Sequence, residues 1–197
     1  RIREVDITGG QVYTIAGSGS AGTSTSNLLA SQFQYPVDLV MDPATHPPWL
    51  YVMDRHRIRG VDLKNNVVLN IAGGTSSGNV DGTSTVARMN NPYGIALDPT
   101  RGQKTFYVAD YNNGRVRELY YGTASPTSTP TVSPTKNPTD TRNPTTAPTV
   151  RGPALVAHSD VTKTLAHVSK AEGVTYDTTN KDLYVISYNH AIYKLAF

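Results

Sequence analysis

Short apolar runs separated by turn residues dominate the chain, and the clearest set lies between residues 37 and 71. The runs are rich in Val, Ile, Leu, Met and Tyr and end at Pro, Gly, Asn or Asp, which is the pattern of short antiparallel strands. The proline that follows Asp42 cannot continue a strand ladder, so it separates the first run from the second. We therefore predict strands at residues 37–41, 50–53, 57–63 and 67–71.

The same pattern returns after 56 residues. Residues 1–54 laid on residues 57–110 without a gap match at 17 of 54 positions, where average amino-acid usage gives about four by chance. The matches fall in blocks, because Arg-Ile-Arg, Ile-Ala-Gly, Asp-Pro and Tyr-Val-x-Asp each occur in both copies. Four short antiparallel strands in each repeat correspond to one blade of a β-propeller.

The repeated blocks carry a resemblance to a known family. The second copy reads Pro-Tyr-Gly-Ile-Ala-Leu-Asp at residues 92–98, Phe-Tyr-Val-Ala-Asp at 106–110 and Asn-Gly-Arg-Val-Arg at 113–117. These motifs resemble the NHL repeats of β-propellers, closely over residues 1–121 and more weakly over 172–196, where YWTD-type propellers are also similar. The resemblance implies an all-β fold, a β-propeller of four-stranded antiparallel NHL-type blades, of which this chain would hold about three and a half.

The resemblance also assigns roles to residues outside the strands. Residues 73–91 resemble the long inter-blade loop of some NHL proteins, and Phe33 and Met89 occupy equivalent positions where they would plug such loops into the core. Asp54 and Asp110 resemble the blade aspartate that bonds turn amides. A pair of catalytic carboxylates one blade apart is the alternative.

A low-complexity tract interrupts the repeat. The 28 residues 123–150 include ten Thr, three Ser and six Pro, and each of these prolines is followed by Thr. Such a segment buries little apolar surface, and its prolines favour an extended polyproline-type rod of about 3.1 Å per residue. We therefore divide the chain into propeller blades at 1–122, a Pro/Thr-rich extended linker at 123–150 and further propeller blades at 151–197.

The composition of the tract is that of O-glycosylated stalks. No Asn-x-Ser/Thr sequon is present, because both Asn-Pro-Thr sequences place the excluded proline in the middle. We predict covalent O-linked glycans on Thr127, Thr131, Thr135, Thr139, Thr145 and Thr149. Candidates for hydroxylation are Pro126, Pro130, Pro134, Pro138, Pro144 and Pro148. An unmodified flexible linker is the alternative.

The charge balance argues against a nucleic-acid partner. Lys and Arg exceed Asp and Glu by only three, too small an excess to favour a polyanion. Acidic residues interleave with Arg57, Arg59, Arg115 and Arg117, and no aromatic stacking residues cluster with them. We expect paired surface charge at these arginines.

Cysteine, histidine and apolar patterns point to no catalytic residue, cofactor or metal. The chain has no Cys, which removes thiolate nucleophiles and thiolate metal sites, and no apolar run is long enough for a membrane span. Its histidines lack any metal-binding spacing, and we expect them to be structural or solvated; they are His46, His56, His158, His167 and His190. No nucleophile elbow, phosphate loop or calcium loop is present.

The repeat count bears on assembly. Removing the tract leaves about three repeats, whereas closed propellers have four to eight blades. Both ends of the sequence fall inside a blade motif, and the chain opens without Met. We therefore expect a segment of a longer polypeptide, or open blade edges completed by other copies of the chain.

Our first hypothesis is a non-enzymatic structural protein, extracellular or at the cell surface. It would be a glycosylated β-propeller subunit that assembles head to tail into a fibre or surface layer. A stalked propeller binding module that recognises a protein or glycan is the second hypothesis. An enzyme of the propeller lyase or lactonase type is the third.

Overall fold

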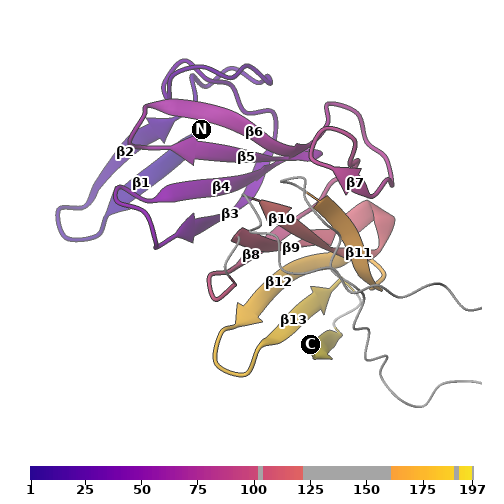
Figure 1. Ribbon diagram of the computed structural model, residues 1–197. Coiled ribbons are helices and arrows are strands. Elements are labelled where there is room, and N and C mark those ends of the chain that lie inside the picture. Colours follow the sequence, from indigo (N-terminus) through magenta and orange to yellow (C-terminus); the bar gives the residue numbers. More distant parts are fainter. Residues whose placement is uncertain (102–103, 122–160, 189–190, 197) are drawn as a thin grey trace, which may run out of the picture.

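The computed structural model describes residues 1–101, 104–121, 161–188 and 191–196, which form an all-β protein (Figure 1). Antiparallel strands make four sheets, and the helical content of the described residues is one 3-10 turn at Tyr111–Asn113. No helix in this part of the chain is long and apolar enough to cross a membrane. The predicted all-β fold is confirmed.

A complete four-stranded blade occupies residues 36–73. Its strands pair antiparallel in chain order and are β3 (Pro36–Asp42), β4 (Trp49–Asp54), β5 (Arg57–Asp62) and β6 (Val67–Gly73). The four strands predicted here match them to within two residues at each end. The turn after β5 is set by Asp62, whose Oδ1 accepts the backbone N–H groups of Lys64 and Asn65, both at 3.0 Å. Local turn chemistry therefore defines the strand boundaries.

The next blade is completed by a strand from beyond the Pro/Thr-rich tract. Its first three strands are β8 (Gly94–Asp98), β9 (Lys104–Asp110) and β10 (Arg115–Tyr121), and β11 (Val161–His167) pairs antiparallel with β10. The short strand β7 (Gly82–Thr83) extends the sheet beyond β11. The tract is thus inserted within one blade. A division of the chain at residue 150 separates strands that share a sheet.

Two partial sheets flank the complete blades (Figure 1). Before β3 lies a hairpin of β1 (Ile2–Asp6) and β2 (Gln11–Ala16). After β11 lies a three-stranded sheet of β12 (Ala171–Asp177), β13 (Asp182–Ser187) and β14 (Ile192–Ala196). By position in the repeat, β1 and β2 correspond to the last two strands of a blade and β12–β14 to the first three. The sheets follow one another as consecutive propeller blades.

Three apolar clusters hold successive sheets together, face against face. The central cluster joins the two complete blades and includes Tyr51 and Phe106, whose ring centroids are 4.5 Å apart. The cluster between the second complete blade and the β12–β14 sheet includes Tyr107 and Leu183. Burial of one large apolar side chain contributes about 1.5–3 kcal/mol, so this packing is the main source of stability.

Candidate functional site

Two buried ion pairs occupy equivalent places in the two complete blades. Nη1 of Arg59 lies 3.1 Å from Oδ2 of Asp54, and Nη1 of Arg117 lies 3.0 Å from Oδ2 of Asp110. All four side chains are fully buried. Burial raises the pKa of Asp110 and lowers the pKa of Arg59, because it disfavours the charged form of each group. The expectation of paired surface charge is therefore wrong for Arg59 and Arg117, which pair in the interior, and for Arg57, which is only 3 % exposed.

The same aspartates fix turns at one end of each blade. Oδ1 of Asp54 accepts the backbone N–H groups of Gln34 and Tyr35 at 2.8 and 2.7 Å, and Oδ1 of Asp110 accepts that of Asn90 at 2.8 Å. This is the role that the NHL resemblance implied. A carboxylate that holds both an arginine and turn amides is a structural group, so these aspartates offer no support for a catalytic pair.

The buried arginines also fasten the two long inter-blade loops. Arg59 donates to the carbonyl oxygens of Gln32 at 3.0 Å and Ser24 at 2.9 Å, and Arg117 donates to that of Arg88 at 2.7 Å. Each guanidinium thus replaces the strand hydrogen bonds that a loop lacks. The loops are held as parts of the blade rather than as free surface segments.

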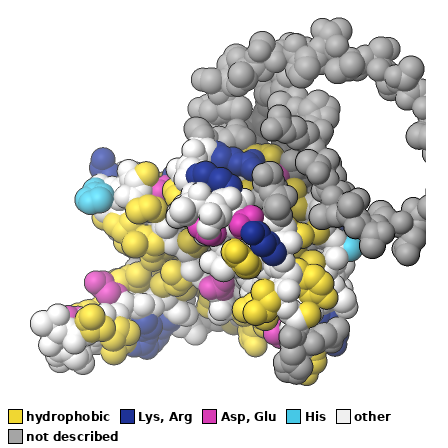
Figure 2. All heavy atoms as spheres, turned by 90° about the horizontal axis from the view of Figure 1, so that it is seen from below, with side chains coloured by type: hydrophobic (Ala, Val, Ile, Leu, Met, Phe, Trp, Pro, Cys, Tyr) yellow, Lys and Arg dark blue, Asp and Glu magenta, His cyan; other side chains and the backbone are white. Residues whose placement is uncertain are grey.

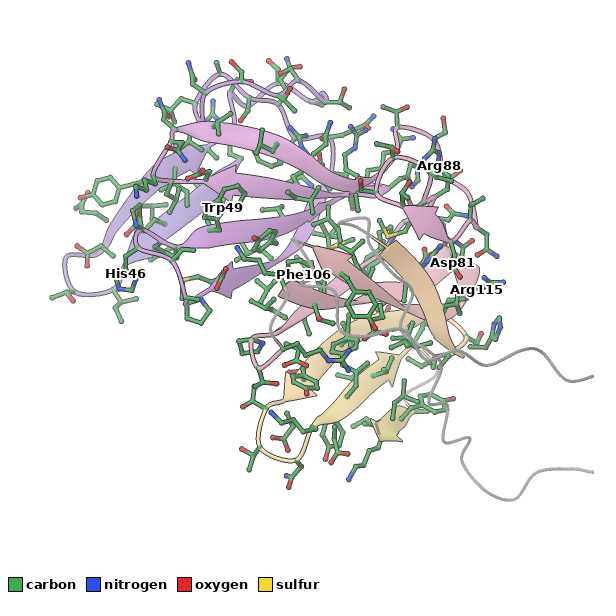
Figure 3. The ribbon with its side chains drawn as sticks, in the orientation of Figure 1. His46, Trp49, Asp81, Arg88, Phe106 and Arg115 are labelled. Atoms are coloured by element: carbon green, nitrogen blue, oxygen red, sulfur yellow. The ribbon has the colours of Figure 1, made fainter. Side chains whose placement is uncertain are left out.

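Apolar plugs hold the same loops from inside. Phe33 and Met89 are 5 % and 1 % exposed and pack in the clusters on either side of the first complete blade, as predicted. The guanidinium of Arg59 lies 5.2 Å from the centre of the Phe33 ring. Figure 3 places Asp81 on the second loop beside β7, where it pairs with Arg117.

The described histidines lie apart from one another. His56 is buried at the β4–β5 turn, where its Nδ1 accepts the backbone N–H of Asn91 at 3.1 Å and its Nε2 lies 3.2 Å from Nε of Arg55. Burial, and then the charges of neighbouring arginines, lower the pKa of His56. His46 and His167 are exposed. The residues that the structure describes include no group of three or more His, Cys, Asp or Glu able to hold a metal ion.

The predicted modification sites fall outside the described residues. This holds for the six threonines and six prolines between residues 126 and 149, and for the histidines at 158 and 190. O-glycosylation of the threonines and hydroxylation of the prolines remain predictions.

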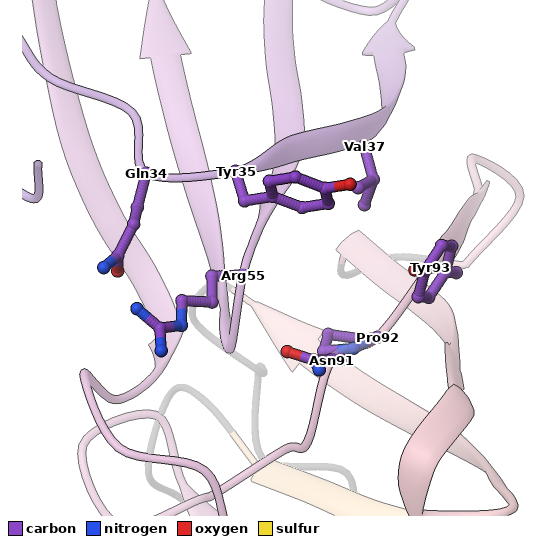
Figure 4. A pocket seen from close by; sticks show the side chains of 7 residues that line it. All are labelled: Gln34, Tyr35, Val37, Arg55, Asn91, Pro92 and Tyr93. Atoms are coloured by element: carbon purple, nitrogen blue, oxygen red, sulfur yellow. The ribbon is translucent and has the colours of Figure 1, made fainter. Parts of the chain in front are cut away.

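An open cavity of about 420 Å³ lies between the two complete blades, at the end where β3 and β8 begin (Figure 4). We name it the inter-blade cavity. Residues 34–37, the β4–β5 turn and residues 91–93 form its walls, through Gln34, Tyr35, Val37, Arg55, Asn91, Pro92 and Tyr93. No sequence motif points to this cavity, because its walls lie about one repeat apart in the chain.

The first complete blade presents an apolar face on β3 that the described strands leave open. Leu39 and Met41 are 44 % and 51 % exposed, whereas Ile95 and Leu97, at the equivalent positions of β8, are 4 % and 9 % exposed. The next blade is covered by a whole sheet, but β3 faces only the β1–β2 hairpin. A cavity of about 340 Å³ between β1 and β3 marks the same gap. We name the surface of Leu39 and Met41 the leading face.

The β12–β14 sheet presents the opposite kind of open face. Ile186 and Ile192 are 51 % and 72 % exposed. The residues equivalent to Ile186 in the complete blades, Met53 and Ala109, are 0 % exposed because a following sheet covers them. We name the surface of Ile186 and Ile192 the trailing face. Seen from below, the molecule shows groups of hydrophobic side chains interspersed with charged and other polar ones (Figure 2).

No model of a known protein family matches the sequence. The chain is 31 % identical over 93 residues to NHL repeat-containing protein 2 of Gallus gallus, a match that covers 47 % of this chain and 12 % of that protein. An auxiliary nutrient binding protein of Bacteroides ovatus has a similar structure, with a TM-score of 0.55 and 16 % identity over 98 % of this chain and 42 % of that one.

A protein of Bacteroides thetaiotaomicron provisionally described as a phosphatase is also similar in structure. Its TM-score is 0.53 at 16 % identity, over 86 % of this chain and 36 % of that one. The chain spans less than half the length of each of these three proteins. It is an all-β protein of propeller type, with sequence similarity to NHL repeats over about half of its length.

Proposed function

We propose that this chain is a non-enzymatic structural protein, a propeller subunit that associates head to tail with other copies of itself. The observation that carries the proposal is the exposure of apolar residues on two faces at repeat positions that are buried elsewhere in the same chain. A contiguous apolar surface of this kind is typical of an interaction site.

The two open faces are complementary halves of one kind of interface. In the central cluster, Ile95 and Leu97 of β8 pack with Tyr51 and Met53 of β4. The leading face repeats the β8 half of this interface, and the trailing face, through Ile186, repeats the β4 half. The blade in front of β3 holds only its last two strands, β1 and β2, and β12 and β13 of another copy correspond to the two that it lacks. Ile186 on β13 then covers the leading face, while β14 gives up the third-strand place to β1. Head-to-tail contacts that do not close a ring generate filaments.

Placement outside the cell and glycosylation belong to the same proposal. The support is the composition of residues 123–150, in which every proline precedes a threonine. Peptide mass spectrometry of this segment from the native source should show hexose-bearing threonines. Unmodified masses alone would contradict the glycosylated form of the proposal.

Sedimentation velocity of the purified chain tests the association. The average mass should rise with concentration for the parent chain and for Leu29→Lys, a control at an exposed loop residue away from both faces. In a chain whose residues 123–150 are replaced by Gly/Ser residues, so that only the two faces can associate, Met41→Lys and Ile186→Lys should each remain monomeric, because a charge on either face prevents the contact.

The mixture of the two variants separates head-to-tail association from a symmetric dimer. Met41→Lys keeps an intact trailing face and Ile186→Lys an intact leading face, so an equal mixture should form heterodimers and nothing larger. A parent chain that stays monomeric at every concentration would overturn the proposal, and would assign the two faces to further blades of a longer polypeptide.

A further inference from the structure

We propose that the inter-blade cavity binds an extended Pro/Thr-rich segment, and that its occupant is residues 123–150 of a second copy of this chain. The cavity adjoins the gap between β1 and β3 at Val37, which lines both, but its tyrosines, Tyr35 and Tyr93, belong to neither the leading nor the trailing face. The proposal therefore stands or fails independently of the blade-face association.

The walls of the cavity combine exposed aromatic rings with hydrogen-bond donors. Tyr35 and Tyr93, on opposing walls, are 62 % and 40 % exposed (Figure 4). The side chains of Gln34, Arg55 and Asn91 contribute amide and guanidinium donors to the same space. The lining has no carboxylate, and Arg55 forms no ion pair with a described acidic residue. The site thus suits a ligand rich in oxygen acceptors with apolar rings.

The backbone of the walls is fixed before any ligand arrives. The backbone N–H of Arg55 donates to the carbonyl of Tyr35 at 3.1 Å, and that of Tyr93 donates to the carbonyl of Ala109 at 3.0 Å. Arg55 and Asn91 hold φ angles of 58° and 46°, a region that side chains other than glycine rarely adopt. Lys170, at the repeat position equivalent to Asn91, has a φ of 49°, so this geometry belongs to the turn before each blade and fixes the cavity wall without itself indicating a ligand.

A proline-rich segment has the matching chemistry. Proline has no N–H, so an extended segment with regular prolines presents carbonyl acceptors and ring surfaces in a nearly fixed arrangement. Aromatic-lined grooves recognise such segments with little loss of chain entropy. Within this chain, residues 123–150 supply six prolines in 28 residues. That segment is the occupant to which the cavity is suited.

The strand register favours a second copy as the source. Tyr121, the last described residue before the tract, pairs with Lys104 at the start of β9, whereas Tyr93 adjoins the opposite end of the blade, where Gly94 pairs with Ala109. The tract therefore leaves the blade at the end away from the cavity. Val161, the first described residue after the tract, pairs with Tyr120 at that same end. A segment that reached its own cavity would have to run back along the whole blade, whereas the cavity of another copy can meet it directly.

A fluorescein-labelled synthetic peptide of residues 123–150, titrated with the full unglycosylated chain, tests the site by fluorescence anisotropy. Binding should saturate, and Tyr35→Ala and Tyr93→Ala should each weaken it about tenfold, as expected for aromatic anchors. Tyr13→Ala, at a 53 % exposed tyrosine on β2, is the matched control and should bind as the parent does. If Tyr35→Ala unfolds at the same temperature as the parent, its loss of peptide affinity is a local effect of removing the ring.

The same titration contains the results that overturn the proposal. A peptide with all six prolines replaced by alanine should lose about tenfold in affinity; equal binding would show that proline is not recognised. Equal binding by Tyr35→Ala and Tyr93→Ala would place the peptide elsewhere. Binding of oligogalacturonate but not of the peptide would make the site a glycan site.

Sedimentation velocity identifies the source of the segment. In the Ile186→Lys background, where blade-face association is absent, the chain should still form weak oligomers that the added peptide dissociates. The second-copy source would be overturned if the chain in that background were strictly monomeric and the added peptide competed with the chain's own tract. The occupant would then be the tract of the same copy.

Discussion

Arginine occurs at three equivalent positions of the repeat, and its surroundings differ among them. Arg59 and Arg117 are fully buried against Asp54 and Asp110, whereas Arg3 is exposed on β1. The chain therefore allows a buried arginine to be compared with an exposed arginine at the same position of the repeat. A buried charge is costly unless its partner is present.

Replacing Arg59 by Met should lower the free energy of unfolding by about 3–5 kcal/mol, because Asp54 is left buried without its partner. The loop carbonyls of Ser24 and Gln32 also lose their donor. Arg3→Met, the matched control on the surface, should change stability by less than about 0.5 kcal/mol. Urea unfolding of the three chains measures both values, and equal losses would contradict the structural role of the buried pair.

His56 gives stability a pH dependence of defined sign. Its pKa in the folded chain lies below the value near 6.5 of an unperturbed histidine, because burial and neighbouring arginines disfavour the charged ring. The unfolded chain then binds the proton more readily, so His56 favours folding fully above pH 6.5 and this contribution falls as the pH drops below it.

His56→Gln should therefore lose less stability than the parent between pH 7.5 and pH 5.5, as read from urea midpoints. His167→Gln, at an exposed histidine of β11, should lose as much stability as the parent between these two pH values. A parent chain whose stability rises on acidification over this range would contradict the assignment.

At the scale of elements, the sequence predicts the strands well and their assembly less completely. Apolar runs and turn residues locate the strands of residues 36–73 because their boundaries depend on local chemistry. The partner of β10 is not predictable in this way, because β11 follows the 39 residues 122–160 and pairing at that distance leaves no local pattern. The inter-blade cavity is not predictable from the sequence for the same reason. The burial of Arg59 is not predictable either, because the sequence pattern of paired charges is the same for a buried pair and for a surface pair.

The close approach of consecutive blades depends on one glycine. A Cβ added at Gly94 would lie 2.8 Å from the carbonyl oxygen of Glu172 and 2.9 Å from the Cα of Gly173, both backbone atoms of β12. Gly94→Ala should therefore push β8 from β12 and cost about 1–3 kcal/mol of unfolding free energy. Chemical denaturation measures the loss.

The matched control is Gly173→Ala, on the other strand of the same contact. A Cβ there would meet its nearest atoms, on Ile186, at an ordinary 3.9 Å. This variant should be as stable as the parent or slightly more stable, because alanine restricts the unfolded chain. A Gly173→Ala chain as unstable as Gly94→Ala would show that the strand tolerates no substitution at all.

At the scale of the whole molecule, the Pro/Thr-rich tract differs from the blades in composition but is inserted within one of them. The tract connects Tyr121 to Val161, which belong to adjacent strands of a single sheet. It therefore closes a loop inside a blade instead of linking two domains. Its length affects the stability of that blade through loop-closure entropy alone, if the tract makes no contact of its own with the blades.

Replacing residues 123–150 with eight Gly/Ser residues tests this arrangement. The connection between Tyr121 and Val161 shortens from 39 residues to about 19, and halving a flexible loop should raise the free energy of unfolding by about 0.6 kcal/mol. Urea unfolding followed through the chain's single tryptophan, Trp49, reports the value. A 28-residue Gly/Ser replacement is the control for composition and should unfold as the parent does. A loss of several kcal/mol in both replacements would show that the tract packs on the blades, and would contradict a contribution from loop-closure entropy alone.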